Sequence, residues 1–325
     1  MRVGLTYDLR TGTDTESEAE YDAPETIDAL SGAIANAGHE VVRIGGLDAL
    51  LRALVGGERW DLVFNIAEGR HGFGREAQVP AVLDAYAVPY TFSDPLTLAV
   101  ALHKGVAKRL ARDGGITTAD FAVIDDPSAL DALDLSFPLF VKPVAEGSGI
   151  GVSDRGQVTD RPTLERTVKA LLRRYRQPVL VERYLGGHEY TVGILGTGKE
   201  ARAIGTLAVE PRNRDAPALA AYGYEEKERY EEHVHYRPVE EREARSVEAL
   251  ALASHRILGC RDLSRVDVRC DAAGTPYFLE INPLPGLHPV RSDIVILARA
   301  RGLSYPALIA TVLEETRRRL DADAA

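Results

Sequence analysis

Two carboxylates, an amide and an arginine occur close together in the segment Leu263–Gly286, LSRVDVRCDAAGTPYFLEINPLPG. Side chains alternate between the faces of a strand, so Arg265 and Asp267 share one face, and on a returning strand Glu280 and Asn282 do the same. Mg²⁺ prefers hard oxygen ligands and takes few of them from protein. Asp267, Glu280 and Asn282 therefore indicate a Mg²⁺ site, with Mn²⁺ as an alternative. A solvated surface hairpin fits the alternation equally well, but the exit NPLPG is a rigid end that exposes backbone N–H groups.

The other face of this hairpin is apolar. Val266 and Val268 point away from the carboxylates on the first strand, and Leu279 and Ile281 do so on the second. The turn residues Asp271–Gly274 join the two strands. We expect the apolar face to pack on a core while the polar face forms the site.

A lysine and a glycine-rich loop form a second motif in Phe137–Ser153, FPLFVKPVAEGSGIGVS. Pro143 stops the apolar strand, so the ammonium of Lys142 emerges at the strand end. The three glycines of Glu146–Gly151 can bring N–H groups close to an anion. The spacing fits neither a P-loop nor a dinucleotide-binding motif. The loop alone is more typical of a plain turn, but the lysine and the hairpin together favour a nucleotide–metal site.

These motifs resemble those of the ATP-grasp carboxylate–amine ligases, and among them the D-alanine–D-alanine ligases in order and spacing, from about Ala99 to Ile294. The resemblance implies ATP as the energy source. A substrate carboxylate attacks the γ-phosphate, an amine attacks the resulting acyl phosphate, and ADP and phosphate leave. The implied partners are small carboxylate and amine substrates, in particular two amino acids.

The resemblance also implies roles for individual residues. Arg265 would stabilise the oxyanion with the backbone N–H of Gly286, and Ser148 would lie near the γ-phosphate and the substrates. Lys227 would reach phosphate from a mobile loop. The segment Val179–Leu195 would hold adenine and ribose, with Glu182 and the backbone around Leu185 at adenine and Glu189 at the ribose hydroxyls. The implied nucleotide-binding residues are Lys104, Lys142, Gly147, Ser148, Gly149, Glu182, Arg183, Leu185, Glu189 and Lys227.

The substrate residues depart from the family pattern. The chain lacks the amino-terminal histidine-glycine-glycine stretch and the glutamate that holds an ammonium in D-alanine–D-alanine ligases; Glu20 or Asp22 is the available substitute. Past Gly286, Arg291 offers a fork for a carboxylate. The predicted substrate residues are Glu20, Glu68, Tyr222, Glu228, Arg291 and Ser292.

Three alternatives remain at this point. The chain could be a true D-alanine–D-alanine ligase of cell-wall synthesis with substituted contacts. It could be a small-molecule kinase or carboxylase that uses the same nucleotide residues without an amine pocket. A catalytically silent nucleotide-binding protein would be expected to lose a metal ligand or the arginine, and all four positions are filled.

Composition is that of an ordinary globular protein. The chain has 325 residues, 45% hydrophobic and 27% charged, with a net charge of −10. That charge argues against nucleic-acid or anionic-membrane partners, because both require a basic surface. Cys260 and Cys270 are expected to be packed thiols. With no long apolar run and no signal sequence, we expect a cytoplasmic enzyme, for which a homodimer is one open arrangement.

The predicted fold is α/β, with α+β character in the C-terminal part, in an ATP-grasp architecture. We expect a doubly wound, substrate-binding α/β domain over residues 1–93, a central subdomain over 94–190 and a C-terminal subdomain over 191–325, the last two sandwiching the nucleotide. Alternation in the first domain predicts a helix from Pro24, a strand His39–Gly45 and a strand Trp60–Ala67. A polar lid loop is predicted over 211–245.

Other polar residues have structural interpretations. A helix is expected over Pro95–Arg112, whose cationic last turn accounts for Lys108. His233 and His235 are interpreted as loop residues rather than metal ligands. Residues 65–69 are interpreted as a strand-end turn; the alternative is that Glu68 and Arg75 line the substrate cleft.

Overall fold

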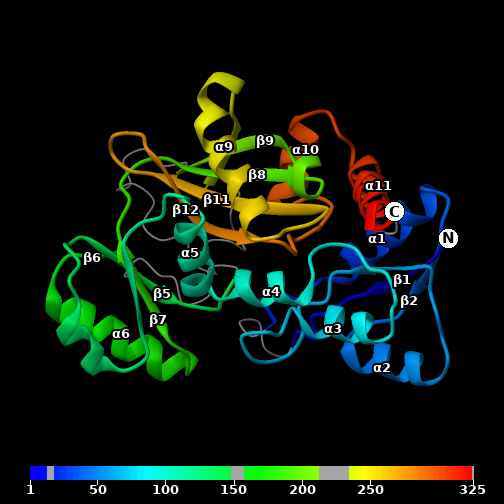
Figure 1. The fold of residues 1–325 in the computed structure, drawn as a ribbon, viewed down its shortest axis with the longest axis horizontal. Coiled ribbons are helices and arrows are strands. Elements are labelled where there is room, and N and C mark those ends of the chain that lie inside the picture. Colours follow the sequence, from blue (N-terminus) through cyan, green and yellow to red (C-terminus); the bar gives the residue numbers. More distant parts are fainter. Residues whose placement is uncertain (13–17, 148–156, 212–233, 324–325) are drawn as a thin grey trace.

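The computed structural model describes residues 1–12, 18–147, 157–211 and 234–323. Three sheets are arranged side by side, with the N-terminal sheet and the central sheet at opposite ends (Figure 1). The candidate site lies where these three sheets and their loops meet.

The N-terminal sheet is parallel, in the order β2-β1-β3. Helices cover both faces: α1 packs with Val3 and Leu5 of β1, and α2 and α3 pack with Val63 of β3. The predicted doubly wound arrangement is therefore present, and the predicted strands are shorter at their ends. The bounds are β1 Arg2–Thr6, α1 Pro24–Asn36, β2 Glu40–Arg43, α2 Leu47–Val55, β3 Leu62–Asn65 and α3 Gln78–Ala85.

The central sheet is antiparallel, in the order β4-β7-β5-β6, and α6 packs on it. Lys142 lies near the end of β5 in this sheet. The bounds are α4 Pro95–Leu102, α5 Lys104–Asp113, β4 Phe121–Ile124, a 3₁₀ turn Pro127–Ala132, β5 Leu139–Pro143, β6 Gln157–Val158, α6 Arg161–Tyr175 and β7 Val179–Arg183.

The C-terminal sheet is antiparallel, in the order β10-β9-β8-β11-β12, and α9 covers one face. The bounds are β8 Glu189–Leu195, a 3₁₀ turn Gly198–Glu200, β9 Arg202–Pro211, β10 Val234–Pro238, α9 Glu241–Ile257, β11 Leu263–Cys270, β12 Pro276–Asn282, α10 Asp293–Ala300 and α11 Tyr305–Asp323.

The helix expected over Pro95–Arg112 is two helices, α4 and α5. His103 takes φ −88° and ψ 89°, outside the helical region, and its Nδ1 accepts a hydrogen bond from Val106 N at 3.3 Å. Lys104 N then donates to Val144 O at 2.9 Å instead of continuing α4. The break places Lys104 at the first turn of α5, beside the end of β5.

The hairpin of β11 and β12 forms as predicted but contains a register shift. Asp267 pairs with Glu280, whereas Val268 pairs with Phe278, so Leu279 bulges out of the ladder. As a result Phe278 rather than Leu279 joins Ile281 in the core. The bulge leaves Glu280 opposite Asp267, and the two carboxylates still meet.

The predicted lid segment 211–245 lies outside the described residues between 212 and 233. Its last part differs from the prediction: Val234–Pro238 is the edge strand β10, paired with β9, and α9 begins at Glu241. Val234 is buried and Tyr236 is half-buried, which gives this short strand an inner face. His235 lies on β10, while His233 falls outside the described residues.

The last helix returns to the first sheet. α11 packs beside α1, and the C-terminus lies near the N-terminal unit (Figure 1). The unit predicted as 1–93 is thus completed by a helix from the end of the chain. The division into three parts stays a prediction.

Two smaller expectations can be compared with the structure. Cys260 and Cys270 are both buried free thiols, as predicted. No single helix in the described ranges is long and apolar enough to cross a membrane. Only α10 and α11 taken together, bent by 104°, satisfy length and composition, and both contribute side chains to the core.

Candidate active site

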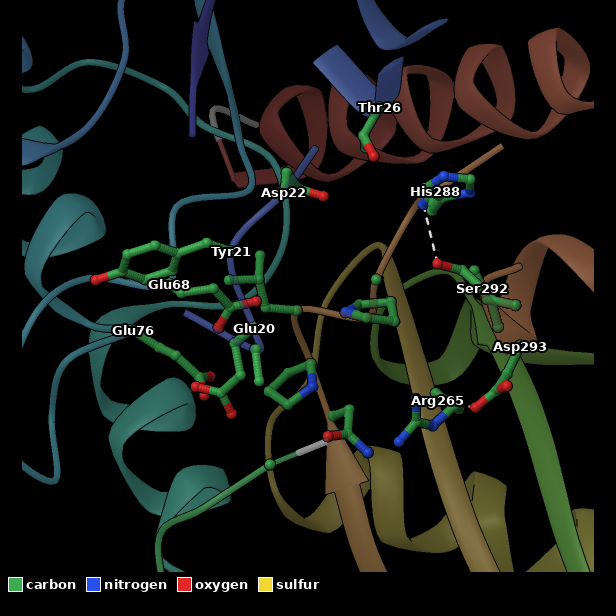
Figure 2. Close-up of a pocket in the computed structure, with 18 of the residues that line it drawn as sticks. Glu20, Tyr21, Asp22, Thr26, Glu68, Glu76, Arg265, His288, Ser292 and Asp293 are labelled. Carbon is green, nitrogen blue, oxygen red and sulfur yellow. Dashed lines mark hydrogen bonds and ion pairs between the residues drawn. The ribbon is translucent and has the colours of Figure 1, made fainter. Parts of the chain in front are cut away.

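A cavity of about 230 Å³ lies where the three parts of the molecule meet. One side consists of the loops that follow β1 and β3, and the other consists of the end of β12 and the segment leading into α10 (Figure 2). The carboxyl ends of neighbouring parallel strands converge at one sheet edge, which is where such sheets bind ligands. The fold therefore brings the N-terminal loops against the β11–β12 hairpin.

Two lysines predicted to bind phosphate meet the carboxylate predicted to bind metal. The Nζ atoms of Lys104 and Lys142 each lie 3.6 Å from Glu280 Oε2. Lys104 Nζ also donates to Glu146 O at 2.6 Å, at the start of the glycine loop. Lys142 is mostly buried at the end of β5, as the strand-stopping Pro143 predicted. The ammonium groups of Lys104 and Lys142 thus lie close to Glu280, a predicted metal ligand. Phosphate binding requires such cations beside the metal ligands.

Glu182 and Lys108 extend this network into the core. Glu182 is 2% exposed and lies 3.3 Å from Lys142 Nζ and 2.9 Å from Lys108 Nζ. Lys108 is fully buried and also donates to Thr118 Oγ1 and Phe278 O. The interpretation of Lys108 as a solvated helix-end cation was therefore wrong. Although burial acts to raise it, the pKa of the Glu182 carboxyl is held below its usual range by the two lysines.

The predicted adenine and ribose segment is fixed to the hairpin turn. Gly187 N donates to Cys270 O at 2.9 Å, and Cys270 N donates to His188 O at 2.8 Å. Leu185 is buried beside this junction. Glu189 forms an ion pair with Arg269 at 3.1 Å.

Arg183, also predicted to bind nucleotide, stacks over the Tyr277 ring with its Cζ 5.1 Å from the centroid. This contact joins the end of β7 to β12. The nucleotide segment is therefore held between the central and C-terminal sheets.

Arg265 is held by two carboxylates. Its guanidinium lies 2.9 Å from Asp267 Oδ2 and 3.2 Å from Asp293 Oδ2. Burial acts to lower the pKa of Arg265, but the neighbouring acids Asp267 and Asp293 leave it raised, so the cation is permanent. Arg265 lines the cavity, and Figure 2 shows it beside Asp293. A fixed, partly buried cation at this position can stabilise an oxyanion.

Asp267, Glu280 and Asn282 meet on one face of the hairpin. Asn282 Nδ2 donates to Asp267 Oδ2 at 3.4 Å, and Thr191 Oγ1 donates to Asp267 Oδ1 at 2.9 Å. No group of three or more histidine, cysteine, aspartate or glutamate side chains suited to a metal occurs within the described residues. Two carboxylates and an amide oxygen still fit Mg²⁺, which completes its coordination with phosphate and water. The donor chemistry supports the sequence prediction.

The segment after β12 forms the opposite end of the cavity. Ser292 Oγ accepts from His288 N at 2.9 Å, and His288 Nδ1 accepts from Arg291 N at 3.3 Å. A Cβ on Gly286 would lie 3.1 Å from Ser292 Oγ, so the backbone of this glycine is closely packed. Gly286, His288, Arg291 and Ser292 all line the cavity.

Carboxylates gather on the N-terminal side of the cavity. Glu20, Glu68 and Glu76 all line it, and Figure 2 shows them on the side away from Arg265. Glu20 forms an ion pair with Arg75 at 2.7 Å, and Arg75 Nη1 donates to Ala145 O at 2.8 Å. Glu68 therefore lines this cavity and Arg75 lines the adjoining one, while a substrate-binding role for either residue stays a prediction.

These acids influence one another. Burial raises the pKa of Glu68 well above its usual range, and Glu20, Glu76 and Asp22 raise it further. Burial and Glu20 likewise raise the pKa of Glu76, while Arg75 and Lys104 oppose the shift. Burial raises the pKa of Asp22 to about 7. The N-terminal wall is thus acidic and holds protons more tightly than free carboxyls do.

The structure adds residues that the sequence did not single out. Glu76 lies just before α3, in the loop that follows β3. Its position after the carboxyl end of a parallel strand is the only sequence signal that could have indicated a role in the site. Arg10 follows β1 and donates to Ala19 O and Tyr21 O at 2.8 Å each. Both residues line the cavity, as do His288 and Asp293.

Some predicted residues lie outside the described ranges. Gly147 is described and lies against Glu20, because a Cβ there would overlap the glutamate carboxylate. The predicted residues outside the described ranges are Ser148, Gly149, Tyr222, Lys227 and Glu228. Their roles stay predictions.

Comparisons with known proteins agree on one family. A family model described as the D-ala D-ala ligase C-terminus matches residues 110–314. The chain is 36% identical over 262 residues to D-alanine–D-alanine ligase B of Chromobacterium violaceum, covering 79% of this chain and 80% of the relative. It is 33% identical over 303 residues to the uncharacterized protein y4sG of Sinorhizobium fredii, covering 90% and 87%.

Solved structures show the same fold. The D-alanine–D-alanine ligase of Bacillus anthracis complexed with ATP has a TM-score of 0.75 at 21% identity, covering 99% of both chains. The VanG D-Ala:D-Ser ligase of Enterococcus faecalis has a TM-score of 0.73 at 17% identity, covering 97% of this chain and 99% of that one. The predicted α/β ATP-grasp architecture is confirmed. The family model covers more than half of the chain, and the chain therefore belongs to the D-alanine–D-alanine ligase family of ATP-dependent C–N ligases.

Proposed function

We propose that this protein uses ATP and Mg²⁺ to join an amino-acid carboxylate to the amine of a second amino acid, or of another amine, releasing ADP and phosphate. The observation that supports it best is the convergence of Lys104, Lys142 and Glu280 beside the cavity that Arg265 lines. Phosphate-binding cations, oxygen ligands and an oxyanion-stabilising cation are the parts that acyl-phosphate chemistry requires.

The reaction has two steps. An oxygen of the first substrate's carboxylate attacks the γ-phosphorus of ATP, so a P–O bond forms and ADP leaves. The ammonium of the second substrate first loses a proton to solvent, and its nitrogen then attacks the acyl carbon. The bond from this carbon to the phosphate oxygen breaks, phosphate leaves, and the nitrogen gives a second proton to the departing phosphate or to solvent. Bound Mg²⁺ supplies neutralisation of phosphate charge in both steps.

The residues of this chain divide the work accordingly. Lys104 and Lys142 hold phosphate oxygens, and Asp267, Glu280 and Asn282 supply the metal ligands. Beside them, Arg265 and the Gly286 N–H stabilise the oxyanion that forms when the amine attacks. The position of the cavity between the N-terminal loops and the β11–β12 hairpin limits access of water to the acyl phosphate.

A second candidate is a ligase that joins two D-alanines, which is the activity named for several relatives. Against it stand Glu68 and Glu76, two carboxyl groups in the cavity wall that have no ion-pair partner among the described residues, because the single ammonium of alanine can pair with only one of them. We therefore place D-alanine second. A cytoplasmic location and a homodimer stay predictions.

The test is ADP release with amino-acid pairs in both chiral forms, with products identified by mass. Release that depends on both a carboxylate and an amine supports the ligase, whereas release with a carboxylate alone would indicate a kinase. Efficient formation of D-alanyl-D-alanine at low millimolar substrate would favour the second candidate. Absence of ADP release with every pair would contradict the proposed function.

A further inference from the structure

Three carboxylates face one side of the cavity, but only one has a cation of its own. Glu20 is paired with Arg75 at 2.7 Å. Glu76 is 9% exposed, and none of the described residues gives its carboxylate a hydrogen bond or ion pair. The same holds for the carboxylate of Glu68. Figure 2 shows both groups directed toward the cavity.

The cations nearby are already engaged. Arg75 also donates to Ala145 O, and Lys104 is held by Glu280 and by Glu146 O. On the far side, Arg10 donates to backbone oxygens of its own loop, and Arg265 is bound by two aspartates. Arg75 acts on Glu68, and Arg75 and Lys104 act on Glu76, from a distance, but none of the described residues forms an ion pair with either carboxylate.

Clustered, buried carboxylates are unfavourable unless a cation joins them. Both burial and mutual repulsion raise the pKa of Glu68 and of Glu76, in a setting that also includes Glu20, Asp22, Arg75 and Lys104. A protein that retains such a cluster in a cavity wall has a site with high affinity for positive charge. One ammonium would satisfy one carboxylate and leave the other unmatched.

Glu68 and Glu76 line the same cavity, of about 230 Å³. A second cavity of about 510 Å³ shares Glu20 and Tyr21 with it, but four arginines line this second cavity: Arg70, Arg75, Arg174 and Arg176. An ammonium group is therefore favoured in the first cavity, beside Glu68 and Glu76, and not in the second.

We propose that one of the two substrates is a diamino acid, whose α-ammonium and side-chain ammonium are held by Glu68 and Glu76. This inference rests on the proposed ligase function, because it names the substrate class of that site. It assigns Glu76 as a specificity-determining residue. Lysine and ornithine are the simplest members of the class.

The experiment compares lysine with norleucine, which has the same chain length but no side-chain ammonium. Binding of both compounds, in D and L forms, is measured by calorimetry on the full chain with ADP and Mg²⁺ present. We expect one form of lysine to bind about tenfold or more tightly than its norleucine counterpart, as expected for one buried charge pair. Equal binding of the two, or no binding of either, would overturn the inference.

Glu76→Gln is the informative variant, and Glu25→Gln, at an exposed position in the first turn of α1, is its control. We expect Glu76→Gln to weaken lysine binding by about tenfold and to change norleucine binding by less than about twofold. Glu25→Gln should change neither. Equal weakening of both ligands would show a structural role and contradict the inference, and melting curves establish that each variant is folded.

The same samples separate this inference from the proposed function. Selective lysine binding without ADP release in the presence of any amine would leave the diamino-acid site standing and remove the ligase activity. ADP release with neutral amino acids and no advantage for lysine or ornithine would do the reverse. The two ideas can therefore fail independently.

Discussion

At the scale of single residues, the site is a chain of alternating charges. Lys108, Glu182, Lys142, Glu280 and Lys104 follow one another with ion-pair distances between 2.9 and 3.6 Å. Buried charges are costly unless each has a partner of opposite sign. These ion pairs hold Lys104, Lys142 and Glu280 beside the cavity before any ligand binds.

Glu280→Gln tests the assignment of Glu280 as a metal ligand within this series of ion pairs. The variant keeps the size of the side chain but removes one negative charge from the proposed ligand set. We expect ADP release to fall by about 100-fold or more while the melting temperature changes by less than about 3 °C. ADP release at saturating Mg²⁺ is compared with that of Glu165→Gln, on the solvent side of α6. Parental turnover in Glu280→Gln would contradict the assignment.

Asp22→Asn tests the acidic wall through stability. Burial raises the pKa of Asp22 from 3.8 to about 7, so between these values the folded state holds the proton more tightly than the unfolded chain. The contribution of Asp22 to the stability of the folded state is therefore fully present below about pH 4 and is lost as the pH rises through about 7. Asparagine has no proton to lose, so the variant should melt about 2–4 °C above the parent at pH 8 and equal it at pH 4.

Thermal melting at the two pH values measures this difference. Asp125→Asn, at an exposed position, is the control and should match the parent at both. A variant that melts below the parent at pH 8, or above it at pH 4, would show that the buried carboxylate is not the cause.

Individual residues also show what the sequence could and could not predict. Strand periodicity and a strand-stopping proline predicted where the side chains of Lys142, Asp267 and Glu280 emerge, whereas Lys104, on a helix, was implied only by the family resemblance. Lys108 was misread, because helix-end cations are usually solvated and its partner Glu182 lies on a strand distant in sequence. The sequence around either residue gives no indication of such a buried ion pair.

At the scale of elements, short interruptions place the site residues. The break between α4 and α5 turns Lys104 toward the end of β5. The bulge at Leu279 lets Phe278 reach the core without displacing Glu280 from Asp267. Periodicity predicted both elements but neither interruption, because each depends on contacts with another segment: Val144 O for the break, and the core for the bulge.

Gly187→Ala tests the segment predicted to hold adenine and ribose. A Cβ on Gly187 would overlap Asp271 O and lie 2.7 Å from Cys270 O, so the backbone must move away from the hairpin turn. That movement shifts Leu185 and Glu189. We expect the KM for ATP to rise about tenfold, with a smaller change in kcat, because the contacts are lost from nucleotide binding itself.

Gly186→Ala is the matched control, because a Cβ there meets only Tyr184 Cε1 at 3.9 Å. Its KM for ATP should stay within about twofold of the parent. Equal effects of the two alanines on KM would show that packing of this loop on the hairpin does not govern ATP binding.

At the scale of the whole molecule, one buried aspartate connects the ends of the chain. Asp262 is fully buried and accepts from Phe92 N at 2.8 Å and from Thr316 Oγ1 at 2.8 Å. Arg319 of α11 forms two bonds to it, both 2.9 Å, and also donates to Tyr90 O. The first and the last of the three parts predicted from sequence are thus joined at one buried residue, which their order along the chain could not reveal.

Arg319→Met tests this connection. Removing one partner leaves the Asp262 carboxylate buried with only neutral donors, and breaking a buried pair in this way costs about 3–5 kcal/mol. We expect a lower melting temperature, with Arg317→Met, exposed on the same helix, close to the parent. The double variant Arg319→Met/Asp262→Asn should recover part of the loss, since the uncompensated charge is gone. Should Arg319→Met melt no lower than Arg317→Met, the packing of α11 on α1 alone would account for how the last helix holds the N-terminal sheet beside the site.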